Sequence, residues 1–218
     1  MMKRRHFSAQ VLTAGLGALA LGGSRLAQAQ GATPAEGVQY VRLSQPQPVQ
    51  VAGKIEVLEF FWYGCPHCND FEPLLSAWVR RLPPDVAFRR VPVAFREEPF
   101  STHQKIYYSL ETMGQVDAMQ RKVFYAIHVE HQRLEKPAEI AALMQKNGID
   151  SAKFMDIFNS FGIAAKLRQA RSLAEAYRID GLPALGVNGQ YYTSGSLSGS
   201  LDNTLAVADY LIQKSRKG

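Results

Sequence analysis

The chain has 218 residues and a formal net charge of +6, from 25 lysines and arginines against 19 aspartates and glutamates. Four of the basic residues and none of the acidic ones lie in the first 29 positions, which leaves 21 against 19, or +2, in the remainder. No sustained basic stripe remains, which argues against a nucleic-acid partner, and residues 30–218 suffice to build a hydrophobic core without disulfide cross-links.

The N-terminal segment has the parts of a secretory signal. A basic start containing Arg4-Arg5 precedes the apolar run Val11–Gly23, and Ala27-Gln28-Ala29 forms a small-x-small cleavage site. The apolar run is too short and too rich in glycine for a stable membrane span. We therefore expect a signal peptide at residues 1–29 and export beyond the inner membrane of a bacterium. The paired arginines leave two routes open, the twin-arginine pathway and general secretion.

The first half of the exported chain alternates strands with one helix. We expect a short strand near Val38–Leu43, a buried strand at Ile55–Phe61, a helix at Pro66–Leu82 and a strand at Val86–Val93. Pro66 suits the first turn of a helix, where a missing N–H has no consequence. Pro73 sits deeper and is expected to kink the helix.

From residue 100 to about residue 161 the pattern is helical, with Gly114 and Asn147-Gly148 as helix stops. The expected later elements are a helix at Ala164–Tyr177, strands at Ala184–Val187 and Gln190–Thr193, and a helix at Leu201–Gln213. Asn188-Gly189 between the two strands is a strong hairpin turn. This order puts a β-α-β half and a β-β-α half into one mixed sheet, with the helical block inserted between them.

Cys65 and Cys68 are the two cysteines of the chain. A disulfide between them closes so small a loop that it adds little stability, and it lies between an expected strand and an expected helix, the context of a redox-active C-x-x-C motif. The alternatives are two buried thiols or half of a zinc site, which would need further ligands. His128 and His131 could share a helix face, but nothing completes a site with them, so we expect a solvated face and no metal.

Three stretches resemble the DsbA family of bacterial periplasmic thiol:disulfide oxidoreductases. They are Val57-Leu58-Glu59-Phe60-Phe61, then Cys65-Pro66-His67-Cys68 followed by Phe71-Glu72, and Gly181-Leu182-Pro183-Ala184 followed by Val187-Asn188-Gly189. The resemblance covers essentially all of residues 30–218. It implies an α/β thioredoxin fold, a mixed sheet flanked by helices, formed by residues 30–99 and 164–218, with an all-helical insertion at residues 100–163.

The resemblance also implies roles for the residues of the motif. Cys65 begins the helix, where unpaired N–H groups and the helix dipole stabilise a thiolate, and a protonated His67 would add to this. The alternative is an exposed loop position for His67. Cys68, inside the helix, is the buried resolving thiol. Leu182 and Pro183, joined by a cis peptide, face the cysteines and offer backbone groups to a substrate strand.

Glu59 is a further expected component of the site. It lies on the apolar strand beneath the motif, where a carboxylate is unfavourable, and the family carries a buried acid here that assists proton transfer at the resolving thiol. Arg90, on the next strand, could pair with it. The alternative is that Glu59 points to solvent beside Glu56.

The expected function is the introduction of disulfides into reduced, newly exported proteins in the periplasm. The Cys65–Cys68 disulfide is expected to act without any other cofactor, in a monomer, and the electrons to pass to a membrane quinone-linked oxidase of the DsbB type. A disulfide reductase or isomerase of the same fold, or a peptide-binding chaperone, are the alternatives. An isomerase would normally need a dimerisation domain, for which we find no segment, and the intact dithiol argues against a chaperone.

Overall fold

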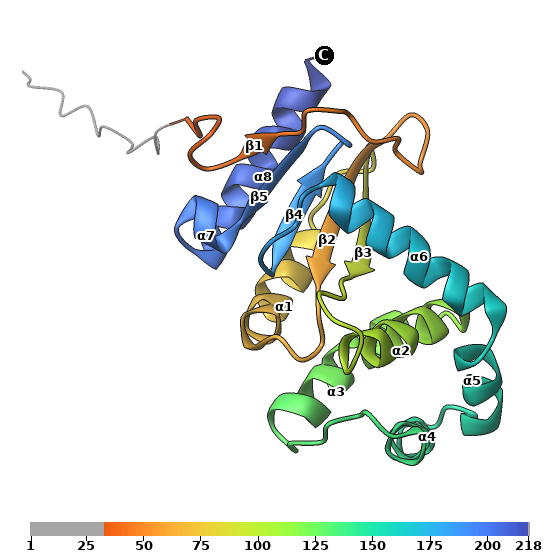
Figure 1. Cartoon of the computed structure of the whole chain (residues 1–218). Coiled ribbons are helices and arrows are strands. Elements are labelled where there is room, and N and C mark those ends of the chain that lie inside the picture. Colours follow the sequence, from red (N-terminus) through yellow and green to blue (C-terminus); the bar gives the residue numbers. More distant parts are fainter. Residues whose placement is uncertain (1–32, 218) are drawn as a thin grey trace, which may run out of the picture. The chain divides into compact units, whose positions relative to one another are not determined.

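Five strands form one mixed sheet in the computed structural model, which describes residues 33–217 (Figure 1). They are β1 (Val41–Arg42), β2 (Ile55–Phe61), β3 (Val86–Pro92), β4 (Ala184–Val187) and β5 (Tyr191–Ser194), in the order β1-β5-β4-β2-β3. β2 and β3 are parallel, whereas β2–β4, β4–β5 and β1–β5 are antiparallel. The expected signal peptide, with its paired arginines and cleavage site, lies outside the described residues.

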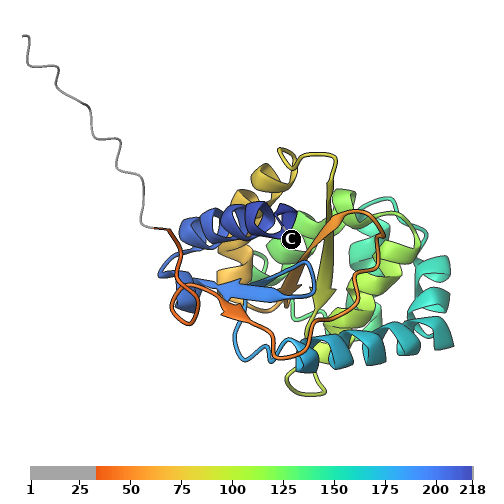
Figure 2. The same ribbon diagram turned by 90° about the horizontal axis from the view of Figure 1, so that it is seen from above.

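β2 is buried on both faces of the sheet. Val57 packs into a cluster with the helices α1 (Pro66–Val79) and α8 (Leu201–Arg216). Leu58 and Phe60 pack on the other face, which is covered by α6 (Phe161–Ala176) (Figure 2). Burial of a side chain as large as phenylalanine stabilises a fold by about 1.5–3 kcal/mol. The unbroken apolar run of β2 is therefore what makes it central.

The helical block lies between β3 and the return of the chain to the sheet (Figure 1). Its helices are α2 (Phe100–Thr112), α3 (Val116–His128), α4 (Pro137–Lys146) and α5 (Ser151–Phe158). Gly114 and Gly148 have φ of 66° and 77° and follow α2 and α4, as predicted for helix stops. α6 begins at Phe161, before the expected start at Ala164, because the hydroxyl of Ser160 caps it by accepting from the N–H of Ile163 at 3.4 Å.

Other boundaries differ from the sequence-based expectation for local reasons. α1 continues past Pro73 but ends at Val79, three residues before the expected end at Leu82, because the N–H groups of Arg81 and Leu82 donate to carbonyl oxygens three residues back, in a tightened final turn. A short helix, α7 (Gly195–Ser198), forms between the last expected strand and the last expected helix, where no element was predicted, since the Ser194 hydroxyl accepts from the N–H of Leu197. Across residues 33–217, the helices are all too short or too polar to cross a membrane.

The turn between β4 and β5 has the predicted conformation. Asn188 and Gly189 have φ of 52° and 65°, the left-handed values of a type I′ hairpin turn. A Cβ on Gly189 would overlap the carbonyl oxygen of Gln47, and the N–H of Gln47 donates to the Gly189 carbonyl at 2.7 Å. Glycine is therefore required at position 189, both for the turn and for the close approach of the backbone at Gln47.

Candidate active site

The two cysteines lie where β2 passes into α1. Cys65 is the N-cap of α1, with an extended backbone, and Pro66 starts the helix. Cys68 lies one turn further in and is completely buried, whereas Cys65 is partly exposed. Both are free thiols in this structure. The chain thus presents one sulfur at the surface and keeps the other beneath it.

The surroundings of Cys65 favour its thiolate. A hydrogen bond from the Cys68 side chain lowers the pKa of Cys65, from 9.0 to about 6, with further contributions from the backbone N–H groups of Cys68 and His67 and from the charge of His67. Burial acts in the opposite direction and is outweighed. His67 is exposed, as the alternative expected, but it lies in the first turn of α1 and not in a loop.

Cys68 differs from Cys65 in the opposite sense. Burial raises the pKa of Cys68 well above 9.0, and the hydrogen bond to Cys65 and the charges of Cys65 and Glu59 act in the same direction. Thiolates are the reacting form in disulfide exchange. The pair therefore consists of a surface sulfur that is ionised near neutral pH and a buried sulfur that keeps its proton.

The segment before β4 faces Cys65. The Leu182-Pro183 peptide is cis, and the Sγ of Cys65 lies 3.8 Å from the carbonyl oxygen of Leu182. A cavity of about 410 Å³ opens beside them, lined by Leu182, Pro183 and Leu201 together with His67. Segments 117 residues apart in the sequence therefore meet at the accessible sulfur.

Glu59 lies in the middle of β2 and is fully buried, so it does not point to solvent. Arg90, its register partner on β3, donates from Nε to Oε2 of Glu59 at 2.9 Å. The other carboxylate oxygen has no hydrogen-bond partner among the described residues. Burial raises the pKa of Glu59 to about 8, the charge of Glu72 adds to this, and Arg90 opposes it.

Glu72 belongs to the same cluster, and the sequence reasoning missed it as a site component. Nη2 of Arg90 donates to both carboxylate oxygens of Glu72, at 2.9 and 3.2 Å, and the side chain of Glu72 is buried. The guanidinium of Arg90 is therefore paired with two buried carboxylates, those of Glu59 and Glu72. A signal was available, because Glu72 is four residues after Cys68 and lies on the same face of α1.

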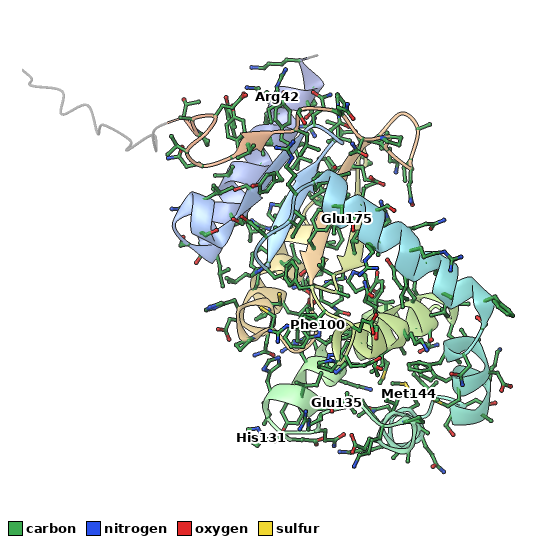
Figure 3. The ribbon with its side chains drawn as sticks, viewed as in Figure 1. Arg42, Phe100, His131, Glu135, Met144 and Glu175 are labelled. Atoms are coloured by element: carbon green, nitrogen blue, oxygen red, sulfur yellow. The ribbon has the colours of Figure 1, made fainter. Side chains whose placement is uncertain are left out.

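The loop before Cys65 is fixed by an aromatic stack. Trp62 stacks on Phe100 at the start of α2, with ring centroids 4.0 Å apart and an angle of 17° between the rings; Phe100 is labelled in Figure 3. The N–H of Cys65 donates to the carbonyl oxygen of Trp62 at 3.0 Å. A Cβ on Gly64 would overlap the Trp62 indole. Glycine at position 64 therefore allows the indole to fold back over the loop.

The expectation that His128 and His131 share a solvated helix face is wrong. His128 is half-buried, its Nε2 lies 2.8 Å from the carbonyl oxygen of Tyr63, and its ring stacks on Phe124. His131 lies beyond the end of α3, exposed, with φ of 57° (Figure 3). Within residues 33–217 no three His, Cys, Asp or Glu side chains are placed to hold a metal ion.

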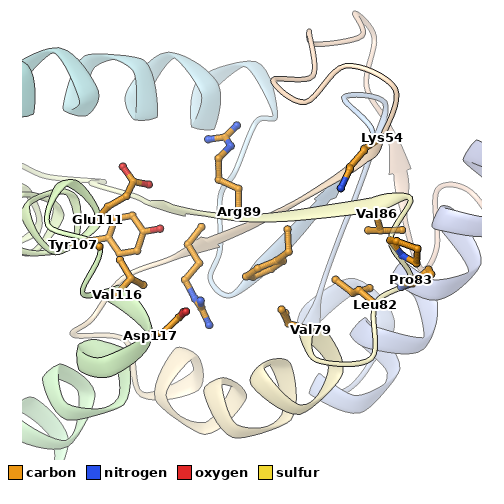
Figure 4. Close-up of a pocket in the computed structure, with 14 residues that line it drawn as sticks. Lys54, Val79, Leu82, Pro83, Val86, Arg89, Tyr107, Glu111, Val116 and Asp117 are labelled. Carbon is orange, nitrogen blue, oxygen red and sulfur yellow. The ribbon is translucent and has the colours of Figure 1, made fainter.

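A larger cavity, of about 610 Å³, lies away from the sulfurs, between the end of α1, β3 and the α2–α3 turn (Figure 4). Leu82, Tyr107 and Asp117 line it, as does Arg90, whose side chain is 11% exposed. Neither cysteine reaches it, so size does not mark the reacting centre. The cavity gives solvent access to the arginine of the Glu59–Arg90–Glu72 cluster and leaves the carboxylates buried.

A dithiol whose two sulfurs differ so widely in acidity is suited to exchanging disulfides. On this sheet, with the proline segment beside it, it defines a thioredoxin-fold thiol:disulfide oxidoreductase. A family model described as a DSBA-like thioredoxin domain matches residues 56–205. The chain belongs to this family.

Relatives and solved structures agree with that assignment. Thiol:disulfide interchange protein DsbA of Burkholderia cepacia is 41% identical over 190 residues, 87% of this chain and 89% of that protein. The DsbA of Pseudomonas aeruginosa strain PAO1 is 44% identical over 180 residues, 83% and 85% of the two chains. A crystal structure of Pseudomonas aeruginosa DsbA has a TM-score of 0.81 at 43% identity, covering 84% of this chain and 95% of that one. The predicted thioredoxin fold with a helical insertion is thus confirmed.

Proposed function

We propose that this chain is a periplasmic oxidant that donates its Cys65–Cys68 disulfide to reduced, newly exported proteins. The observation that carries the proposal is the placement of the two sulfurs, with Cys65 accessible at the N-cap of α1 and Cys68 fully buried one turn further on, which moves their pKa values in opposite directions. A stabilised thiolate favours the reduced form, so the disulfide is readily given up. The names of the relatives, thiol:disulfide interchange protein DsbA, support an oxidase over a reductase, an isomerase or a chaperone.

The exchange proceeds in two displacements. A substrate thiolate attacks Sγ of Cys65, a bond forms between these sulfurs, and the Cys65–Cys68 bond breaks. A second substrate thiolate then attacks the substrate sulfur of this mixed disulfide, and Cys65 leaves as the stabilised thiolate. Two electrons have then passed from the substrate to the protein: the substrate carries the disulfide, and Cys65 and Cys68 are reduced.

The remaining site residues position these steps. Pro66 and His67 form the helix start that stabilises the leaving thiolate of Cys65. Leu182 and Pro183 hold an extended substrate strand beside the sulfur through backbone groups and the adjoining cavity. When the disulfide opens, Glu59 gives a proton to the Cys68 thiolate. When the disulfide closes, Glu59 takes that proton back.

Reoxidation and location complete the proposal. The reduced dithiol passes its electrons to a membrane quinone-linked oxidase of the DsbB type. The protein acts as a monomer in the periplasm after removal of residues 1–29, and it needs no cofactor besides its own disulfide. Residues 30–99 and 164–218 form the thioredoxin-like part, and residues 100–163 the insertion.

Serine variants test the assignment of the two thiols. Cys65→Ser should abolish exchange, because the accessible nucleophile is gone. Cys68→Ser should accumulate mixed disulfides through Cys65, because no second thiol can displace the bound partner. Each reduced variant is mixed with a substrate protein that carries a disulfide, and non-reducing electrophoresis separates these results: the Cys65 thiolate attacks that disulfide, a mixed disulfide forms, and the other substrate sulfur leaves as a thiolate. Adducts on Cys65→Ser and none on Cys68→Ser would reverse the roles.

A further inference from the structure

One face of α3 holds Tyr63, two residues before Cys65. Gln120, Phe124 and His128 follow one another at intervals of four residues, so they lie along one side of the helix. Oε1 of Gln120 accepts from the Tyr63 hydroxyl at 2.7 Å. Phe124 packs edge-on against the Tyr63 ring, with centroids 5.1 Å apart, and His128 contacts the Tyr63 carbonyl oxygen. The helical block thus packs against and hydrogen-bonds to the loop that precedes the reactive sulfur.

The amide of Gln120 links this loop to the buried carboxylates. While its oxygen accepts from Tyr63, its Nε2 donates to Oε2 of Glu72 at 3.5 Å. Gln120 is only 2% exposed, so water does not readily replace either contact. Buried polar groups that are fully paired act in concert, and removal of one donor affects its partners.

The buried carboxylates of Glu72 and Glu59 accept hydrogen bonds from different numbers of donors. Glu72 accepts from Arg90, from the Ser76 hydroxyl and from Gln120. Glu59 accepts only from Arg90, and one of its oxygens is unpaired in the described part of the chain. Hydrogen bonds to a carboxylate favour its charged form. Because one cation cannot neutralise two buried anions, the less well supplied carboxylate is the one that takes up a proton.

The charged and titratable groups around Glu59 come from four elements. They are Arg90 on β3, Glu72 and Cys68 on α1, Tyr107 on α2 and Tyr63 in the loop before Cys65. On the β4 side its register partner is the apolar Leu185. Gln120 acts on this group only through Glu72 and Tyr63, which makes it a positioning residue.

We propose that Gln120, from the helical block, decides where the proton of the buried cluster resides: by supplying a hydrogen bond to Glu72 it keeps that carboxylate ionised and leaves the proton on Glu59. This inference rests on the proposed exchange chemistry. When Cys68 attacks a mixed disulfide at Cys65, the Cys68–Cys65 bond forms and the partner leaves as a thiolate. The proton of Cys68 passes to the ionised Glu59, so this step accelerates as Glu59 loses its own proton.

The test measures the lifetime of the glutathione adduct on Cys65 against pH. The reduced protein is mixed with oxidised glutathione, quenched in acid and analysed by intact mass spectrometry. The limb of the profile that belongs to Glu59 is identified by its loss in Glu59→Gln. In Gln120→Leu, Glu72 competes better for the proton, so the midpoint of the Glu59 limb should fall by about half to one pH unit, the size of one ordinary hydrogen bond.

A second variant predicts a shift in the same direction. Gln120→Glu is nearly isosteric and keeps the Tyr63 contact, but an ionised carboxylate cannot donate to Glu72. Its charge lies beside Glu72 and favours a proton there more than on Glu59, so the midpoint of the Glu59 limb should again fall. It also serves if Gln120→Leu does not fold. Gln145→Leu, at an exposed position of α4, is the matched control and should leave the profile unchanged.

The Cys65 thiolate titration separates a proton-placing role from a merely structural one. Its midpoint should stay unchanged in both Gln120 variants, because groups at the helix start set it. Folded variants with an unmoved Glu59 limb, or with a displaced Cys65 titration and no limb shift, overturn the inference. A wild-type protein that forms no adduct would contradict the proposed function itself, which keeps the two failures distinct.

Discussion

Position within one helical turn explains why Cys65 and Cys68 behave as different chemical groups. Cys65 caps α1 and receives donors from the helix start, whereas Cys68 is removed from water by the core. The helix N-terminus stabilises an anion, and burial without such donors destabilises it. The reduced form of the protein is therefore stabilised at one sulfur, and this is the source of its oxidising power.

The reduced protein should lose stability as the pH falls from about 9 toward 6. Folding lowers the pKa of Cys65 from 9.0 to about 6, so the ionised thiol contributes its full stabilisation above the unfolded value, and this is lost as the pH falls through the folded value. Urea unfolding at several pH values measures the effect, with the oxidised protein as the control. Parallel pH dependence of the two forms, or a thiolate absorbance that titrates near the ordinary value, would refute this.

Local signals in the sequence were sufficient for part of the site. The C-x-x-C motif identified Cys65 and Cys68 as a candidate redox pair. The position of a charged residue within an apolar strand identified Glu59 as a candidate buried acid. Arg90 followed from the next strand. Gln120 and His128 could not be found in this way, because their contacts with Tyr63 depend on how α3 packs against a loop that is distant in sequence. No periodicity or propensity encodes that placement.

Gly64→Ala should destabilise the loop between β2 and α1. The new Cβ would overlap the Trp62 indole, which must then leave its stack on Phe100, and overpacking of this kind costs about 1–3 kcal/mol. Urea unfolding and tryptophan fluorescence measure the effect. Gly162→Ala, in α6 where a Cβ has room, is the control and should be neutral or stabilising. Equal stability of the two variants would show that the indole is free to move.

Pro183→Thr should slow substrate release and accumulate mixed disulfides in a folded protein. Proline has no N–H, so the strand edge facing Cys65 is open to an incoming chain, and threonine would add a donor and a branched side chain there. Trapped adducts can be counted by mass spectrometry after mixing with a reduced substrate. Pro137→Thr, at the start of α4, should trap nothing. A Pro183→Thr protein with normal turnover would show that this segment does not contact substrate.

The central elements were predicted more accurately than their ends. Ile55–Phe61 and Ala184–Val187 match β2 and β4 residue for residue, because continuous apolar runs bounded by turns specify buried strands. The ends of α1 and α6 were missed by three residues each. Those ends depend on capping hydrogen bonds and on the tightening of a final turn, which compete over a few residues.

The site draws on parts of the chain that are far apart in sequence. β2 and α1 supply the dithiol and the buried acids, the segment before β4 supplies Leu182 and Pro183, and α3 supplies the contacts to Tyr63. Side-chain placement of this kind exists only in the folded protein. The compartment in which folding takes place therefore bears on when the dithiol becomes active.

Replacement of Arg4-Arg5 by Lys-Lys distinguishes the two export routes left open by the sequence. Twin-arginine export is read by a receptor and should be blocked, although the charge is unchanged. General secretion requires only the positive charge, so export should continue. Fractionation of cells expressing the variant, with N-terminal sequencing of the exported form, decides between them. Export of mature protein beginning at Gln30 would reject the twin-arginine route and leave the proposed function untouched.

The equilibrium redox potential of the Cys65–Cys68 pair, measured against glutathione, tests the proposed oxidant most directly. Because the Cys65 thiolate is stabilised in the reduced protein, we expect a potential well above that of the glutathione couple. Raising the pKa of Cys65 by His67→Ala should make the potential more reducing. A wild-type potential near that of a thioredoxin-like reductant, roughly −270 mV, would contradict the assignment as a disulfide donor.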